Sequence, residues 1–351
     1  MHPFVSGNSA NDRHEVQGAP SDCVSSVRFS PPGCPLLLLG VTSWDKSCRV
    51  WQVNSRADGT DIQSRPMTFA ENDAPILDMS FSADGRAFWG GCSKTATMWN
   101  LTTNQKTIVA SHDLPISCVA YVSPGICSEM LITGSWDGKL RFWDLRQQRP
   151  AKEENFGEPV FALDAQRSLP MAACVTGRKA HVFNLQTLVK TNEVRPPALV
   201  KFNLRCVSCS PQKDGVAVGS SEGRVSFIPL RSDTGCTFKA HIVFDDAAMF
   251  MYQTNFCVMS PTAPHIITGG SDGRIAYWDY KKRVNIGFSE AAPAMEDRNK
   301  SISAGDISSD GRLLAYARSY DWSMGKSHCI ANEPHNIYIR NAADPKILGL
   351  K

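Results

Sequence analysis

Short apolar runs recur along the whole chain and alternate with polar turns. Residues 130–132, 216–218 and 313–315 are examples, and their lengths are those of strands rather than helices. Asp-Gly pairs at residues 84–85, 214–215 and 310–311 come just before such runs. These pairs tolerate the positive φ angles that tight hairpins require. The pattern predicts many short antiparallel strands, with the apolar runs as buried central strands.

A repeated turn sets the spacing of these strands. Three times an acidic turn residue lies six positions before a tryptophan: Asp45 before Trp51, Asp137 before Trp143, and Asp272 before Trp278. Weaker copies of the turn place further anchors at residues 99, 183 and 228. Successive anchors are roughly 40–50 residues apart, which is the length of one four-stranded blade plus its loops. The segment after residue 278 leaves room for one more blade, so the sequence predicts an all-β, seven-bladed propeller.

Such a ring must close, because an open last blade would expose a sheet edge. Strands of blade seven are predicted near residues 302–307, 313–318 and 336–340, which leaves one strand missing. A β-capable segment near residues 13–17 is predicted to supply it. The expected organisation is an N-terminal arm with the closing strand (1–20), the propeller (21–344) and a short C-terminal tail (345–351).

Composition narrows the class of protein. The chain has 351 residues, of which 42% are hydrophobic and 20% charged, so it can bury a substantial core. A net charge of +3 is too small for a broad nucleic-acid footprint, so any such contact needs a local patch. No signal peptide or membrane-spanning stretch is predicted, which places the protein inside the cell without membrane insertion. The 12 scattered cysteines are expected to be free, mostly buried thiols.

Motifs that carry catalysis or bind cofactors are missing from the sequence. It has no phosphate-binding glycine loop, no serine nucleophile elbow and no His-rich cluster. Cys206 and Cys209 have the spacing of half a zinc site, but no second ligand pair stands at zinc spacing. An enzyme would also need convergent titratable residues at the central channel, and the sequence indicates none. We therefore expect no catalytic residue, metal, cofactor or small-molecule substrate.

Two insertions exceed the minimal blade length, residues 236–254 and 321–335. The first mixes aromatic and methionine side chains with Lys239 and His241, a composition suited to a docking surface. Its aromatic residues could equally pack the junction of blades five and six. The basic run 281–283 fits a groove for an acidic peptide or a phosphate backbone, and a solvated charge cluster is the alternative.

Several segments resemble one family. Residues 134–144, 269–279 and 315–325 are similar to the messenger-RNA export factors of the nuclear pore, the RAE/GLE family of WD-repeat (WD40) proteins. The most specific match is Ser-Tyr-Asp-Trp-Ser at 319–323 followed by Ile-Arg-Asn-Ala-Ala at 339–343, and the resemblance runs from about Glu15 to Asp344. A related mitotic-checkpoint adaptor that binds kinetochore proteins shares the Ser-Tyr start but not the Asp-Trp-Ser continuation, and it remains the alternative.

The resemblance implies a non-enzymatic scaffold that binds a nucleoporin segment of the GLEBS type and supports export of mRNA. It implies a location in the nucleus, at the nuclear envelope and pore, with shuttling to the cytoplasm. Contact with RNA or mRNP, directly or indirectly, and with spindle or checkpoint proteins is also implied.

The resemblance also places a partner-binding groove for a nucleoporin or nucleic acid. Its residues here are Phe238, Lys239, Trp278, Asp279 and Arg283. The aromatics are expected to form an apolar pocket and the bases its rim, so that Trp278→Ala or Arg283→Glu weakens binding without unfolding the protein. A further basic residue of the groove is replaced by Asn285, which implies weaker binding of nucleic acid.

In WD repeats a histidine holds the turn aspartate, and a strand hydroxyl and the tryptophan complete the network. Blade three alone is expected to supply all four groups, from His112, Thr133 or Ser135, Asp137 and Trp143. A buried aspartate needs such partners, so this tetrad is interpreted as structural rather than catalytic.

Overall fold

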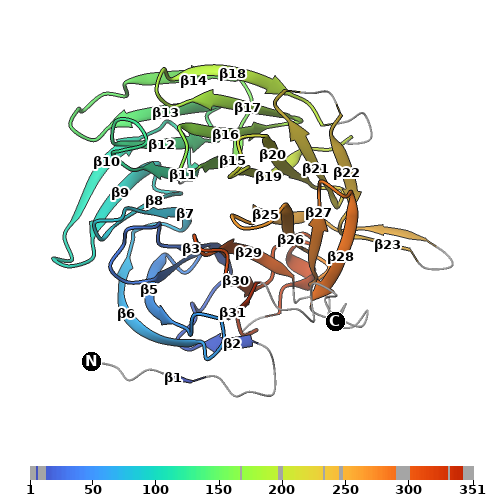
Figure 1. Ribbon diagram of the computed structural model, residues 1–351. Helices are drawn as coiled ribbons and strands as arrows, with labels where there is room; N and C mark the ends of the chain where they lie inside the picture. Colours follow the sequence, from blue (N-terminus) through green and yellow to red (C-terminus); the bar gives the residue numbers. More distant parts are fainter. Residues whose placement is uncertain are drawn as a thin grey trace.

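The computed structural model describes residues 5–6, 13–166, 168–196, 201–231, 234–244, 248–289, 301–330 and 333–342. Seven antiparallel sheets form a ring around a central channel (Figure 1), which confirms the predicted all-β propeller. None of the described residues forms a helix long and apolar enough to cross a membrane. A short 3₁₀ helix, η2 (Lys326–His328), lies in the second insertion.

Each blade has four strands, numbered here from the channel outward. In blades one to four they are β3 (Val24–Phe29), β4 (Leu38–Ser43), β5 (Ser47–Asn54) and β6 (Gln63–Glu71); β7 (Ile76–Phe81), β8 (Arg86–Gly91), β9 (Thr95–Asn100) and β10 (Lys106–Ser111); β11 (Ile116–Val122), β12 (Met130–Ser135), β13 (Lys139–Asp144) and β14 (Lys152–Asn155); and β15 (Val160–Ala165), β16 (Met171–Thr176), β17 (Lys179–Asn184) and β18 (Val189–Val194). In blades five to seven they are β19 (Leu204–Cys209), β20 (Gly215–Ser220), β21 (Arg224–Pro229) and β22 (Cys236–Lys239); β25 (Thr254–Met259), β26 (His265–Gly270), β27 (Ile275–Asp279) and β28 (Val284–Ser289); and β29 (Ile302–Ile307), β30 (Leu313–Arg318), β31 (Asn336–Asn341) and β2 (Arg13–Val16).

The repeated turn of the sequence corresponds to one structural position in the blades. All six anchor residues, from Trp51 to Trp278, lie in the third strand of their blade. Two of the three Asp-Gly pairs supply the expected positive φ at glycine, with 87° at Gly85 and 74° at Gly311. The third pair differs, because Gly215 already belongs to β20 and the positive φ of 61° falls on Lys213.

The N-terminal strand closes the ring. β2 pairs with β31, with Arg13 opposite Arg340 and Val16 opposite Ile337 (Figure 1). Val16 is buried in the core cluster that joins blades seven and one. Upstream of it, β1 (Val5–Ser6) pairs with β6. The proposed C-terminal tail, residues 345–351, lies outside the described residues.

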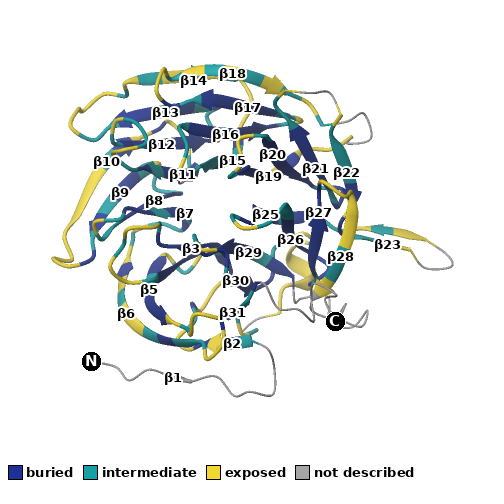
Figure 2. Ribbon diagram, viewed as in Figure 1, coloured by how far each residue is buried: buried dark blue, intermediate teal, exposed yellow. Residues whose placement is uncertain are grey.

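Burial follows the radius of the ring. The inner three strands of the blades are largely buried, whereas the outer strands, such as β10 and β18, are mostly exposed or half-buried (Figure 2). The hydrophobic clusters lie between neighbouring blades, as where Phe227 of blade five stacks on Tyr280 of blade six. Blade stability therefore depends on the neighbours on either side.

The antiparallel order sorts the loops onto two faces. Turns between second and third strands, and connections from one blade to the next, fall on the same face, which we call the upper face. Turns between first and second strands and between third and fourth strands fall on the lower face. The insertion after β22 forms a hairpin of β23 (Ile242–Phe244) and β24 (Met249–Met251), which projects from the ring (Figure 1).

Candidate functional site

The four residues predicted for the blade-three tetrad meet in one hydrogen-bonded chain. Trp143 Nε1 donates to Thr133 Oγ1 at 2.8 Å, and that hydroxyl lies 2.8 Å from His112 Nε2. His112 Nδ1 lies 2.9 Å from Asp137 Oδ2. Burial lowers the pKa of His112 although Asp137 opposes this, so the ring is neutral and donates from Nδ1 to the carboxylate. Thr133, not Ser135, is the hydroxyl of this network.

The order threonine, histidine and aspartate resembles a catalytic triad, but its position excludes that role. The hydroxyl of Thr133 would be the nucleophile, and this residue is fully buried between strands. It also accepts the tryptophan N–H, so it faces the blade interior. A substrate cannot reach it, and the network stabilises the turn instead.

Blade six contains a shorter network of the same kind, made of a histidine, a threonine and an aspartate without the tryptophan. His241 Nδ1 lies 2.8 Å from Asp272 Oδ1, and His241 Nε2 lies 3.1 Å from Thr268 Oγ1. The sequence hid this network because the β23–β24 hairpin separates the histidine from the first strand of its blade. His241 is fully buried and belongs to the turn, not to a docking surface. Trp278 Nε1 has no hydrogen-bond partner among the described residues.

A third buried histidine gives stability a pH dependence. His181 Nε2 lies 2.9 Å from Thr176 Oγ1, and the ring stacks on Phe156 at 4.3 Å. Burial lowers the pKa of His181 from 6.5 to about 4, against the opposing charge of Glu193. Below the unfolded-state pKa the unfolded chain binds a proton that the folded chain does not, so stability falls as the pH drops through this window.

We expect His181 to contribute up to about 3 kcal/mol to this loss. His181→Leu should therefore show a shallower loss of unfolding free energy between roughly pH 6.5 and pH 4 in urea titrations. His328→Leu, at an exposed position, is the control and should keep the wild-type slope. Equal slopes in wild type and His181→Leu would contradict the assignment.

The two aromatics predicted for the partner groove lie in the core. Phe238 and Trp278 are 7% and 6% exposed, and their rings stack with centroids 4.8 Å apart. Phe288 meets the indole edge-on at 6.3 Å. The stacking of Phe238 on Trp278 joins blades five and six. For these two rings, the structure shows the alternative in which aromatics pack the junction between the blades. Because the indole is buried, we expect Trp278→Ala to lower the stability of the protein as well as any binding.

The charged members of the predicted groove divide into two kinds. Asp279 is buried, and its Oδ1 accepts the backbone N–H groups of Lys281 and Lys282 at 3.0 and 2.8 Å, so it shapes the turn. Arg283 is exposed in the same lower-face turn and donates to the carbonyl oxygen of Thr234 at 3.1 Å. Lys239 is exposed at the end of β22, with Nζ 4.8 Å from the ring of Phe244.

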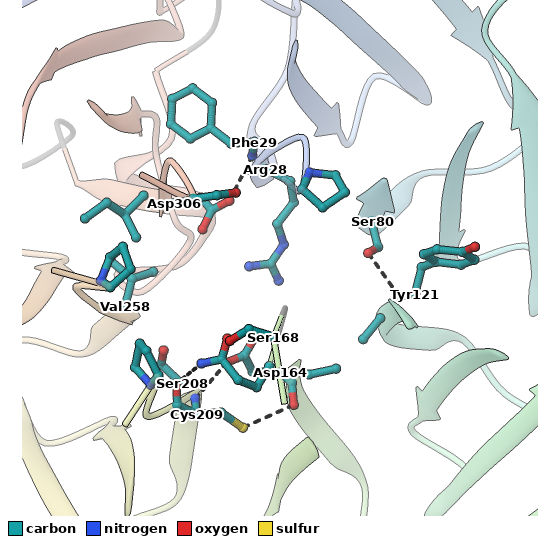
Figure 3. Close-up of a pocket in the computed structure, with 18 of the residues that line it drawn as sticks. Arg28, Phe29, Ser80, Tyr121, Asp164, Ser168, Ser208, Cys209, Val258 and Asp306 are labelled. Carbon is teal, nitrogen blue, oxygen red and sulfur yellow. Dashed lines mark hydrogen bonds between the residues drawn. The ribbon is translucent and has the colours of Figure 1, made fainter. Parts of the chain in front are cut away.

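The central channel holds an ionic cluster that the sequence did not reveal. Arg28 extends into a cavity of about 200 Å³, with Asp306 and Asp164 on either side (Figure 3). Its guanidinium lies 3.1 Å from Asp78 Oδ1. Burial disfavours the charge on Arg28, but Asp78, Asp306 and Asp164 outweigh it and raise its pKa. The expectation of no convergent titratable residues at the channel was therefore wrong.

These carboxylates fasten three pairs of neighbouring blades. Asp306 Oδ2 accepts the N–H of Phe29 at 2.8 Å, and Asp164 Oδ2 accepts that of Cys209 at 2.7 Å (Figure 3). Asp78 Oδ2 accepts the N–H of Val119 at 3.0 Å. Each bond crosses from one innermost strand to that of the following blade. The cluster is explained by the structure of the ring.

The second insertion is anchored by the aspartate of the Ser-Tyr-Asp-Trp-Ser motif. Asp321 Oδ2 accepts hydrogen bonds from Asn255 Nδ2 at 2.7 Å and from Ser271 Oγ, both in blade six. Burial alone would raise the pKa of Asp321, and these hydrogen bonds lower it instead. The next residue, Trp322, is 48% exposed at a φ of 59°, a conformation rare for bulky side chains. The motif thus holds an aromatic ring out on the upper face.

Further large apolar side chains are exposed on the same face, in turns of blades one, three and seven and in connections into blades three and five. They are Trp44, Leu114, Trp136, Phe202 and Trp322. The sequence analysis missed them. The signal was a repeated Ser-Trp-Asp turn at residues 43–45 and 135–137, where the central tryptophan is not needed by the turn network.

Comparison with known proteins agrees with this architecture. The family model "WD domain, G-beta repeat" matches residues 11–52 and 103–144. Protein Rae1 of Drosophila melanogaster is 30% identical, over 97% of this chain and 96% of its own length. Protein RAE1 of Arabidopsis thaliana is 33% identical (96% and 93%), and mRNA export factor GLE2 of Chaetomium thermophilum is 31% identical (95% and 91%). The chain belongs to the Rae1/GLE2 family of mRNA export factors.

Solved structures share the fold of this Rae1/GLE2 family member at low identity. The structure of U3-55K and that of the RRP9 WD40 repeats are each 15% identical, with TM-scores of 0.74 and 0.75. They cover 95% and 97% of this chain and 100% of their own.

The WD40 matches explain how a Rae1/GLE2 propeller closes. The match at 11–52 spans β2 to β5, and the match at 103–144 spans β10 to β13. Each sequence repeat therefore ends at a third strand and begins near the outer strand of the preceding blade. The outer strand of the first repeat, β2, pairs with β31 and so completes blade seven.

Proposed function

We propose that this protein is a non-enzymatic adaptor in mRNA export that holds a GLEBS-type nucleoporin segment on its upper face. The observation that carries the proposal is the set of exposed aromatic and leucine side chains on that face, together with the membership of the Rae1/GLE2 family. Large exposed apolar groups on a rigid scaffold are typical of binding sites. The proposal places the protein in the nucleus, at the nuclear envelope and pore, with shuttling to the cytoplasm.

The chemistry of this face suits an extended peptide. Tryptophan anchors commonly supply most of the binding energy of an interface. Trp44 and Trp136 sit in turns whose aspartates are fixed by hydrogen bonds, at 2.6 Å from Ser47 Oγ to Asp45 and 2.9 Å from His112 to Asp137. Because those turns are already ordered, binding costs little conformational entropy on the side of the propeller.

A second contact is proposed for RNA or mRNP at the basic lower-face turn of residues 281–283. The side chains of this turn, Lys281, Lys282 and Arg283, are all exposed. Because the net charge of the chain is only +3, binding of nucleic acid needs a local basic patch such as this one. Phosphate contacts of this type are independent of sequence and weaken as salt rises. The five-residue groove of the sequence analysis remains a prediction. Its exposed members are Lys239 and Arg283, of which Lys239 lies at the upper-face end of β22 and Arg283 in the lower-face turn.

The double variant Trp44→Ala/Trp136→Ala is expected to bind a labelled GLEBS peptide at least about tenfold more weakly, measured by fluorescence anisotropy. Phe69→Ala is the matched control, because Phe69 is an exposed aromatic on the outer strand β6. Arg283→Glu should leave the peptide affinity unchanged and weaken binding of a single-stranded RNA. Equal peptide affinity in the double variant and wild type would reject the upper-face site.

The mitotic-checkpoint adaptor remains the alternative function. Affinity capture from nuclear extract, followed by mass spectrometry, separates the two. Nucleoporins and mRNP proteins retained by wild type and lost in the double variant would support the export adaptor. Kinetochore proteins in place of nucleoporins would support the checkpoint adaptor.

A further inference from the structure

Three side chains with metal-binding atoms meet where the ring closes. Asp22 and Cys23 lie in the connection from the closing strand β2 to β3, and His335 precedes β31 at the end of the second insertion. One ligand atom from each residue lies within 4.8 Å of the other two. The residues come from opposite ends of the sequence, so no ligand spacing along the chain could have revealed them.

We propose that Cys23, His335 and Asp22 form a binding site for a zinc-class divalent cation. Thiolate, imidazole and carboxylate are the three ligand types that zinc prefers, and a water molecule would complete a tetrahedron. Ligands at about 2.0–2.3 Å from zinc lie about 3.3–3.8 Å apart. Side-chain rotations that move the three ligand atoms by about 1 Å would bring them to that spacing. The site adjoins Trp44, whose N–H donates to the carbonyl oxygen of Cys23 at 3.0 Å, but it would bind a cation rather than a peptide, so it goes beyond the proposed function.

The backbone that carries two of the ligands is fixed by hydrogen bonds. The N–H of Cys23 donates to Asp22 Oδ1 at 2.6 Å, and the carbonyl oxygen of Cys23 accepts the N–H of Trp44 at 3.0 Å. The Cys23 side chain is buried, whereas Asp22 is exposed, so the cluster lies at the edge of the core where a cation can enter from solvent.

The histidine is also prepared for ligation. His335 Nδ1 lies 3.0 Å from Ser319 Oγ, the hydroxyl that also accepts the N–H of Val24 at 3.0 Å. Such a second partner fixes the imidazole plane and leaves Nε2 for a cation.

The charges and protons of the binding step balance. The cation displaces the proton of Cys23, which passes to solvent, and a bond from sulfur to metal replaces the S–H bond. The thiolate and the Asp22 carboxylate together neutralise a charge of +2. An occupied site would tie the start of blade one to the loop that presents Trp322, across the closure of the ring.

Cobalt(II) is the first probe, because a cobalt–thiolate bond gives a charge-transfer absorption band. The full-length chain, stripped with chelator and dialysed, is expected to bind one cobalt ion with this band, and zinc should displace it. Cys23→Ser should abolish the band. In zinc titrations Cys23→Ser and His335→Ala should lose more than about 100-fold in affinity, since even outer-shell partners contribute about 10–100-fold.

Two control variants change a cysteine and a histidine in the second insertion, which also contains His335. Cys329→Ser and His328→Ala change an exposed cysteine and an exposed histidine and should bind as wild type does. Circular dichroism of the metal-free variants checks folding. Asp22→Asn, at an exposed residue, is expected to fold normally and to bind at least about tenfold more weakly, which keeps the test valid if a buried variant misfolds. No thiolate band in wild type, or a band that survives in Cys23→Ser, overturns the proposal.

Discussion

Replacing Trp278 by alanine is expected to lower the free energy of unfolding by about 3–5 kcal/mol. The indole is 6% exposed and lies between Phe238 and Phe288, so its removal leaves a cavity at the junction of blades five and six. Removing a buried aromatic costs both its transfer energy and the cavity that remains. Urea unfolding followed by circular dichroism measures the loss.

Trp44→Ala is the matched control for this prediction. Trp44 is 41% exposed on the upper face, so its substitution is expected to change stability by no more than about 0.5 kcal/mol. The comparison separates a core tryptophan from a surface one within the same chain. A Trp278→Ala protein as stable as wild type would contradict the burial of the indole. It would mean that the Trp278 side chain is exposed to solvent, as expected of a partner-binding residue.

Deleting residues 1–17 is expected to have a larger effect, because it removes the closing strand. The deletion exposes the core around Val16, whose burial contributes about 1.5–3 kcal/mol. It also removes the pairing of β2 with β31, at about 0.5–1.5 kcal/mol for each hydrogen bond. Two links to blade one are lost as well, from His14 Nε2 to Ser64 Oγ at 2.7 Å and from Trp51 Nε1 to the carbonyl oxygen of Gln17 at 2.9 Å.

The deleted protein should melt at a lower temperature and aggregate, because β31 becomes an unpaired edge. Differential scanning calorimetry and light scattering measure the two effects. Deleting residues 1–11 leaves β2 intact and is the control, expected to behave as wild type does in both measurements. A synthetic peptide with the sequence of residues 11–18 should restore part of the stability of the longer deletion. Unchanged melting of that deletion would show that the ring holds without β2.

The arrangement of the blades was readable because it depends on local sequence. An acidic turn residue six positions before a third-strand anchor is a requirement of one hairpin, and hairpin geometry is set by a few adjacent residues. The same holds for the Asp-Gly turns at Gly85 and Gly311. At the third Asp-Gly pair the positive φ angle falls on Lys213 instead of Gly215, so the predicted position was off by two residues.

The site residues depend on contacts between blades, and these are not local. Phe238 and Trp278 carried the chemistry of a binding pocket in the sequence, yet the packing of two blades buries both rings against each other. His241 was separated from its partners Thr268 and Asp272 by a hairpin, which hid the second turn network. Residue type alone does not tell whether an aromatic ring faces a partner or a neighbouring blade.

The sequence by itself determined the number of blades, the third strand of each repeat, the strand that closes the ring and the blade-three residues that form its turn network. Each of these follows from short-range periodicity and turn chemistry. The tertiary structure alone decided which aromatics are exposed, how Arg28 meets three aspartates in the channel and how Cys23 approaches His335. These contacts arise only when the ring closes and brings distant parts of the chain together.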